Sequence, residues 1–133
     1  MTIEPVVFKT LTKEAVFKTV SKQIIVSNTN NIYWVSHNDS VFSSNVNWSL
    51  IPGGPSCGFI PGPENSVYFD FNGLGSCLFD IPVQIFRLNL LSGYPGFVKQ
   101  KDFPFTSGDV NINGGTFLCG SAPVQINGSL TVS

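Results

Sequence analysis

The sequence predicts an all-β fold, and among all-β folds it favours a short parallel β-solenoid. From residue 67 onward, short runs rich in Val, Ile, Leu and Phe alternate with turns of Gly, Ser, Asn and Pro, which is the composition of strands and their connections. Most of the turns differ from the two-residue Asn-Gly type that closes a hairpin. The runs are also short and evenly apolar, as stacked coils require. A β-sandwich or jelly roll is the alternative.

The first half of the chain divides into an arm, a hairpin and a loop. We expect residues 1–22 to form a basic arm and residues 23–133 a single all-β domain. Residues 23–26 and 32–35 read as two strands around the turn cluster 27–31, which predicts a hairpin. Residues 36–66 are rich in Pro and Gly, so we expect a long surface connection anchored by Trp48 and Phe59.

The second half predicts a series of strands separated by glycine turns. The best internal echo lies between residues 110–114 and 124–128, where Val-Asn-Ile-Asn-Gly returns as Val-Gln-Ile-Asn-Gly, and it suggests successive coils. The expected strands are residues 67–71, 77–80, 83–90, 97–100, 103–105, 109–113, 116–119, 123–127 and 129–132.

Composition limits the possible functions. Only 11% of the 133 residues are charged and the net charge is −1, against a usual charged share of about a quarter. We therefore expect a surface of Ser, Thr, Asn and Gly, or a surface partly buried against other subunits. Non-specific nucleic-acid binding is not expected, because it needs many Lys and Arg residues. No run is apolar enough for a membrane span, and residues 1–22 do not read as a signal peptide.

The positive charge gathers at the N-terminus. Residues 1–22 hold four lysines and two glutamates, whereas the remainder holds three basic and six acidic residues. This asymmetry suggests either a solvated terminus or an arm that docks on an acidic neighbour. The candidate docking residues are Lys9, Lys13, Lys18 and Lys22.

The sequence gives little support for an enzyme. Two or three clustered carboxylates would be needed for glycan cleavage, but Asp70 and Asp80 are half a typical coil apart and should lie on different faces. His37 lacks a nucleophile elbow. The three cysteines have no metal-binding spacing. We therefore expect no catalytic residue, cofactor, metal site or small-molecule substrate. Free, buried cysteines are expected, and one disulfide with a spare thiol is the alternative.

Aromatic side chains are the candidates for glycan binding, because their faces stack on apolar faces of sugars. Trp34 and Trp48 are the preferred candidates, and Tyr33, Tyr68 and Tyr94 are others. Packing in the core is the competing interpretation for each of them.

Residues 48–133 also carry a recognisable order of motifs. A tryptophan precedes a Gly/Pro-rich loop, a Val-Tyr-Phe-Asp strand, a Cys-containing strand, a Ser-Gly-Tyr-Pro-Gly turn and a Gly-Gly-Thr-Phe corner. In this the sequence resembles the opening coils of bacterial and phage β-helix surface proteins, although Asn65-Ser66 stands where those proteins usually have an Asp before the strand. The motifs are Trp48, Gly53-Gly54, 61–63, 67–70, 92–96 and 114–117.

The resemblance implies a parallel β-helix, and the sequence itself reaches Ser133 on an expected strand with no polar cap. We expect Leu130 and Val132 to lie at that end and to contact another polypeptide. The favoured function is a structural virion protein, a capsid decoration or fibre-associated component that self-assembles, as a homotrimer, and binds a capsid shell or fibre protein. One alternative is an adhesive, glycan-binding module on a bacterial cell surface. A fragment of a polysaccharide-acting β-helix enzyme is the other.

Overall fold

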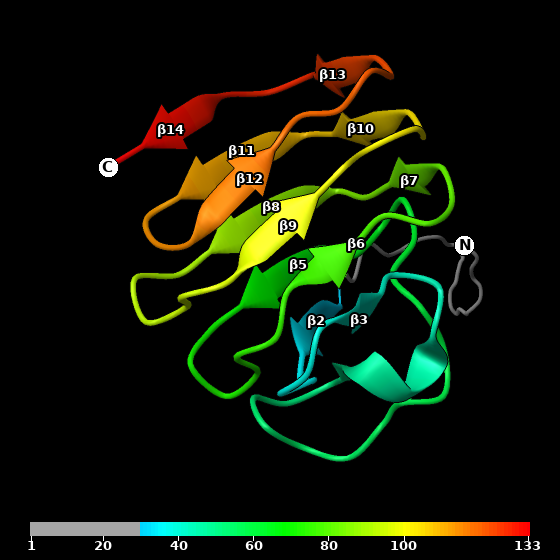
Figure 1. The fold of residues 1–133 in the computed structure, drawn as a ribbon, viewed down its shortest axis with the longest axis vertical. Coiled ribbons are helices and arrows are strands. Elements are labelled where there is room, and N and C mark those ends of the chain that lie inside the picture. The colour runs from blue at the N-terminus through cyan, green and yellow to red at the C-terminus, as the bar shows by residue number, and fades with distance from the viewer. Residues whose placement is uncertain (1–29) are drawn as a thin grey trace, which may run out of the picture.

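The chain forms an all-β solenoid of stacked parallel strands (Figure 1). The computed structural model describes residues 30–133, and within them the only helix is one 3-10 turn, η2 (Asn45–Asn47). The coils that begin with β5, β8 and β11 each pass through three sheets, and every strand pair is parallel except β2 with β4. The predicted solenoid is therefore confirmed and the sandwich alternative is wrong, because sandwiches are built from antiparallel pairs.

The strands belong to three sheets that form the faces of the solenoid. A six-stranded sheet contains, in spatial order, β14 (Leu130–Val132), β11 (Asp109–Ile112), β8 (Arg87–Leu90), β5 (Ser66–Phe69), β2 (Asn31–Trp34) and β4 (Trp48–Ser49). A four-stranded sheet contains β12 (Thr116–Leu118), β9 (Phe97–Lys99), β6 (Cys77–Leu78) and β3 (Ser40–Val41). A three-stranded sheet contains β13 (Val124–Ile126), β10 (Phe105–Ser107) and β7 (Val83–Gln84).

The register of the six-stranded sheet places like residues above one another. From β5 onward, residues paired between successive strands of this sheet are 20 to 22 positions apart, whereas those paired between β2 and β5 are 35 positions apart. One inward column runs through Ile32, Val67, Leu88, Val110 and Leu130. Because side chains alternate along a strand, the residues directly before and after each member of this column point outward.

Aromatic side chains fill the interior. The rings of Trp34, Trp48 and Phe69 contact one another at centroid distances of 5.1 to 5.8 Å, and Phe79 and Phe105 continue the series toward the later coils. All five are buried. Edge-to-face and tilted pairs of this kind add to the stabilisation from area burial, so the core is a continuous aromatic column.

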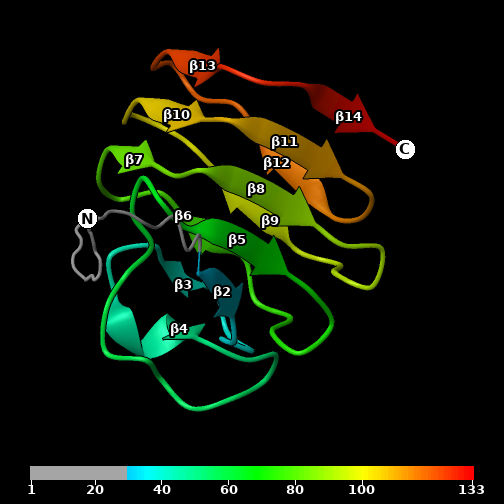
Figure 2. The ribbon, with the colours of Figure 1, turned by 180° about the vertical axis from the view of Figure 1, so that it is seen from behind.

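The N-terminal end of the solenoid is closed by the chain itself. Figure 2 shows β4 and η2 at the opposite end of the stack from β13 and β14. Trp48 on β4 is buried and donates its indole N–H to the carbonyl of Phe42 at 2.9 Å. The expected anchor role of Trp48 is thus confirmed, whereas that of Phe59 is wrong because its side chain is largely exposed.

Two other predictions about the strands need correction. Residues 83–90 form two strands, β7 and β8, because the chain turns a corner at Ile85 and Phe86 between two sheets. The echo between 110–114 and 124–128 is not the coil repeat, since β11 stacks on β14 whereas β13 stacks on β10. The first strand of the expected hairpin, residues 23–26, and the arm 1–22 lie outside the described residues.

Candidate functional site

The C-terminal end of the solenoid presents unpaired strand edges. Within residues 30–133, β12, β13 and β14 each pair on one side only, with β9, β10 and β11 respectively. These strands form the last layer of the stack (Figure 1). Their free backbone N–H and C=O groups are a template on which a further strand can pair.

Apolar side chains surround these edges. Leu130 and Val132 are 56% and 67% exposed, although they occupy the inward columns above Val110 and Ile112. A hollow of about 150 Å³ opens between the three strands, lined by Ile112, Phe117, Val124, Ile126, Leu130 and Val132 among others. We call this surface, formed by β12, β13 and β14 with the hollow between them, the open end.

The strands of the open end carry no charged side chain. Residues 110–133 contain no Lys, Arg, His, Asp or Glu, but the carboxylate of Asp109, 3.6 Å from Arg87, accepts the backbone N–H of Ser129 at 2.9 Å, next to Leu130. Natural edge strands are usually protected by charged side chains, prolines or bulges. Within residues 30–133, this edge has none of the charged side chains that usually protect an exposed strand.

The residues predicted to contact a partner lie in two parts of the chain, of which the structure describes one. Leu130 and Val132 lie at the open end, as expected, and their contact with a partner stays a prediction. Phe117, Val124 and Ile126 share the same surface but were not among the predicted residues, because the sequence does not show which strands stack. Lys9, Lys13, Lys18 and Lys22 lie outside the described residues.

Trp34 and Trp48 are not placed to contact a glycan. Both indole rings have no exposed surface, and their N–H groups are bonded to the carbonyls of Gly75 and Phe42. The prediction of glycan contact is therefore wrong for both residues. Their spacing between apolar residues already favours the core, and the structure places them in the centre of the aromatic column.

Two of the other aromatic candidates do reach the surface. Tyr33 and Tyr68 are neighbours on β2 and β5, half-buried, and their rings stack at 5.0 Å with an angle of 21°. Desolvation, with the nearby Tyr68 and Asp70, raises the pKa of Tyr33. The outward column continues from this pair through Asn89 and Asn111, whose side chains are joined by a 3.0 Å hydrogen bond.

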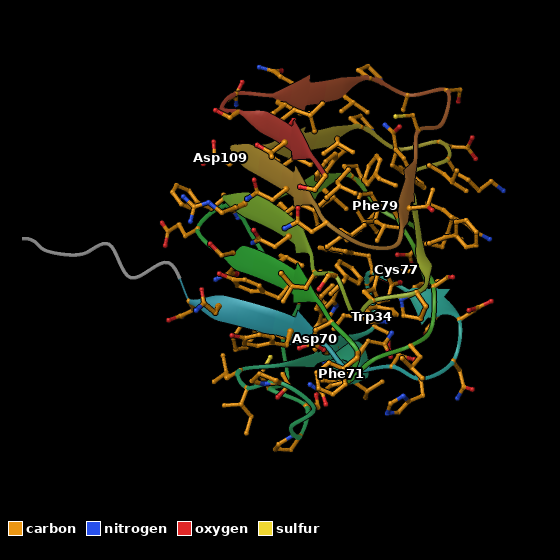
Figure 3. All side chains as sticks on the ribbon, turned by 90° about the vertical axis from the view of Figure 1, so that its left-hand side faces the viewer. Trp34, Asp70, Phe71, Cys77, Phe79 and Asp109 are labelled. Carbon is orange, nitrogen blue, oxygen red and sulfur yellow. The ribbon has the colours of Figure 1, made fainter. Side chains whose placement is uncertain are left out.

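The carboxylates of the described coils bind backbone groups rather than gathering in one place. Asp70 accepts the backbone N–H of Asn72 at 2.9 Å, and Asp80 accepts that of Ser43 at 3.0 Å. Figure 3 shows Asp109 at the start of β11 and Asp70 just past the end of β5, toward opposite ends of the strands of the six-stranded sheet. The expectation that Asp70 and Asp80 lie on different faces agrees with these contacts, because Asp70 stabilises its own turn after β5 whereas Asp80 joins two successive coils at Ser43.

Metal ligands and reactive thiols are also dispersed. Among residues 30–133 no cluster of three His, Cys, Asp or Glu side chains is placed to hold a metal ion. The three cysteines are unpaired: Cys77 is buried, Cys57 is partly buried and Cys119 is exposed. Burial raises the pKa of the Cys77 thiol, and Asp80 raises it further. Such a thiol stays protonated and behaves as a small apolar side chain.

Comparison of this chain with protein-family models, with curated proteins and with solved structures finds no match. No helix within residues 30–133 is of the length and apolarity that crossing a membrane requires. The fold and the open end are therefore the observations from which a function can be argued.

Proposed function

We propose that this chain is a structural protein that acts by self-assembly, as a capsid decoration or fibre-associated component of a virion. The observation that supports it is the open end, where three strand edges that have no partner within residues 30–133 surround an apolar hollow. Backbone edges and apolar side chains of this kind are stabilised when another polypeptide covers them.

The use of polar side chains supports a structural role. Gln100 is fully buried, and its amide nitrogen donates to the carbonyls of Phe103, Ala122 and Pro123 at 2.9 to 3.1 Å. Its amide oxygen accepts the backbone N–H of Gly120 at 2.8 Å. A group bonded in this way stabilises the coil and is not free to bind a substrate.

The proposed function includes two further contacts, one made by the N-terminal arm and one between subunits. The basic arm, with Lys9, Lys13, Lys18 and Lys22, is proposed to dock on an acidic surface of a capsid shell or fibre protein. The homotrimer that the sequence favours remains a prediction, which needs a lateral contact between coils. The virion is the proposed location.

The proposal is tested at two levels. Sedimentation velocity of the pure chain, over a concentration series from about 1 to 500 μM, should show an oligomer whose share grows with concentration. Quantitative proteomics of purified virus particles from the source should recover the chain at a fixed ratio to the shell protein. A chain that stays monomeric throughout the series contradicts the self-assembly.

A second candidate function is glycan binding on a bacterial cell surface, and the stacked pair Tyr33 and Tyr68 favours it. The two phenol groups provide a stacking face and hydrogen bonds on the outward column. The amide of Asn89 does not add to them, because it is buried and already bonded to Val67 and Asn111. A glycan array should then give signals that Tyr68→Ala abolishes and that Phe71→Ala, at an exposed aromatic outside the column, leaves unchanged. The third alternative, an enzyme fragment, gains no support from the dispersed carboxylates.

A further inference from the structure

We propose that Asn113 is a site of spontaneous deamidation, at which the side-chain amide is lost and an aspartyl or isoaspartyl residue takes its place. Asparagine is a thermolabile residue, and glycine after it favours the reaction because no Cβ atom keeps the glycine nitrogen from the preceding side chain. The sequence has three such pairs, all at corners of the described coils: Asn72-Gly73, Asn113-Gly114 and Asn127-Gly128. The structure distinguishes them and favours the pair at Asn113.

The reaction needs only water as its co-reactant. Hydroxide removes the proton from the backbone nitrogen of Gly114, and this nitrogen attacks the side-chain carbon Cγ of Asn113. The new N–Cγ bond closes a succinimide ring, the Cγ–Nδ2 bond breaks, and the side-chain nitrogen takes a proton from water and leaves as ammonia. A water molecule then opens the ring at either carbonyl, which gives aspartate or isoaspartate. One water is consumed, one ammonia is released, and nothing is oxidised or reduced.

The attacking nitrogen differs between the three pairs. Within residues 30–133 no backbone carbonyl accepts the N–H of Gly114, whereas Gly73 and Gly128 each donate to a backbone carbonyl at 3.3 Å. In the same part of the chain Ser92, over which Gly114 stacks, also donates to no backbone carbonyl, although a complete coil follows it. A bonded N–H must lose its hydrogen bond before the nitrogen can attack, so the reaction is least hindered at Gly114.

The carbonyl that is attacked already accepts a hydrogen bond. The hydroxyl of Ser133 donates to Oδ1 of Asn113 at 2.8 Å. Negative charge develops on this oxygen as the nitrogen adds to Cγ, and a donor placed there stabilises that charge. Asn127 has a comparable donor, the side-chain amide of Gln125 at 2.9 Å, so the difference between these two sites lies at the attacking nitrogen.

Acidic side chains lie beside the other two pairs and not beside Asn113. A Cβ atom at Gly128 would strike the carboxylate of Asp109, and the carboxylate of Asp70 accepts the backbone N–H of Asn72 at 2.9 Å. A nearby negative charge opposes the removal of a proton from the adjacent nitrogen. The corner at Gly114 packs instead against uncharged residues of the preceding coil.

Deamidation changes the corner between β11 and β12 in two ways. It adds a negative charge to residues 110–133, whose side chains carry none. The isoaspartyl product also lengthens the backbone by one carbon atom at a corner where a Cβ atom on Gly114 would already strike the carbonyl of Leu91. The pairing of β12 with β9 follows this corner, so we expect the isoaspartyl chain to be less stable than the unmodified chain.

The test follows the three sites in the full chain by mass spectrometry of peptides during incubation at about 37 °C and about pH 8. Chymotryptic cleavage after Phe71 and Phe117 places each Asn-Gly pair on its own peptide. In the folded chain Asn113 should deamidate at least about threefold faster than Asn72 or Asn127. In guanidinium chloride the three sites should react at similar rates, because only the fold distinguishes them.

Two matched variants test the cause. Ser133→Ala should slow deamidation at Asn113 by about two- to tenfold and leave Asn127 unchanged, because only the first site loses its donor. Asp109→Asn keeps an acceptor for the N–H of Ser129 but removes the negative charge, so it should speed deamidation at Asn127 and leave Asn113 unchanged. Circular dichroism should show that both variants retain the fold.

The rates decide the matter in either direction. A folded chain in which Asn113 stays intact, or reacts no faster than Asn72 or Asn127, overturns the assignment of this site. A rate at Asn113 that Ser133→Ala leaves unchanged overturns the part given to the hydroxyl. These rates do not depend on the oligomeric state, so they leave the proposed self-assembly to its own test.

Discussion

The indole of Trp34 and the phenol of Tyr94 donate hydrogen bonds to the same acceptor, the carbonyl oxygen of Gly75, at 3.0 and 2.7 Å. The two side chains approach it from β2 and from the turn before β9. Both rings are buried. The carbonyl of Gly75 therefore joins three consecutive coils near the centre of the aromatic column, where Figure 3 shows Trp34 below Cys77 and Phe79.

Removal of the Tyr94 hydroxyl should weaken the fold by a modest amount. Tyr94→Phe keeps the ring in its place against Phe69 and deletes one buried hydrogen bond, while Trp34 still satisfies the carbonyl of Gly75. We expect the free energy of unfolding to fall by about 1 kcal/mol, measured by urea denaturation. Tyr68→Phe, on the half-buried outer face, is the control, and an equal loss there would show that the Gly75 contact is not the cause.

The position of Gly75 should tolerate no side chain. A Cβ atom there would collide with the backbone carbonyl of Asn38, whereas one at Gly62 would lie 4.0 Å from its nearest neighbour, the side chain of Asn65. We expect Gly75→Ala to lower the free energy of unfolding by about 3 kcal/mol or more, because backbone atoms must move. Thermal unfolding of Gly75→Ala and Gly62→Ala side by side checks this, and similar melting temperatures would contradict it.

Gln100 should be the most sensitive polar position of the later coils. Gln100→Leu preserves the approximate size of the side chain but leaves the N–H of Gly120 and the carbonyls of Phe103 and Ala122 without their buried partner, whereas the carbonyl of Pro123 keeps the backbone N–H of Phe105. Unsatisfied buried groups cost about 1 to 3 kcal/mol each, so we expect a loss of at least about 3 kcal/mol in chemical denaturation. Gln84→Leu, on an exposed side of β7, should change the stability by less than about 0.5 kcal/mol.

The sequence predicts the class of this fold because local composition decides it. Short apolar strands with glycine corners at Gly108 and Gly114 leave little choice of architecture: a Cβ atom at either position would strike a backbone carbonyl of the preceding coil, from Phe86 or Leu91. The stacking partners are decided by long-range packing instead. The strands β11 and β13 are similar in sequence but belong to different sheets. The strand on which β13 stacks, β10, is separated from β11 only by the corner at Gly108.

The candidate site could be predicted in part. Leu130 and Val132 follow from the position of the last apolar strand, but the contributions of Phe117, Val124 and Ile126 depend on a coil length of about 20 residues that the echo in the sequence obscures. The sequence predicts the two tryptophans as site residues, but both belong to the core. An aromatic residue in a strand can contact a sugar or pack in a core. Trp34 lies two residues after Ile32 on the same, inward face of β2, so it packs in the core.

Alkaline pH should destabilise the protein through two buried groups. Burial raises the pKa of Cys77 well above its ordinary value of 9.0, and that of Tyr94 above 10.0. Below pH 9 both groups are protonated in the folded and unfolded states, and their contribution to stability is complete. Above pH 9 the unfolded chain releases the Cys77 proton while the folded chain retains it, and above pH 10 Tyr94 behaves in the same way. Stability should therefore fall as pH rises, by up to about 1.4 kcal/mol per pH unit for each group.

Urea denaturation of the wild type and of Cys77→Ala, from pH 8 to 11, checks this slope. The substitution lowers stability at every pH because it leaves a small cavity beside Val98, but it also removes one titrating group. We expect the difference in unfolding free energy between the wild type and Cys77→Ala to shrink between pH 9 and 10, because only the wild type loses stability through the titration of this thiol. Tyr94→Phe should flatten the curve only above pH 10, since its ring is kept and its proton is absent. Parallel curves for the wild type and both variants would mean that the alkaline loss arises elsewhere in the chain.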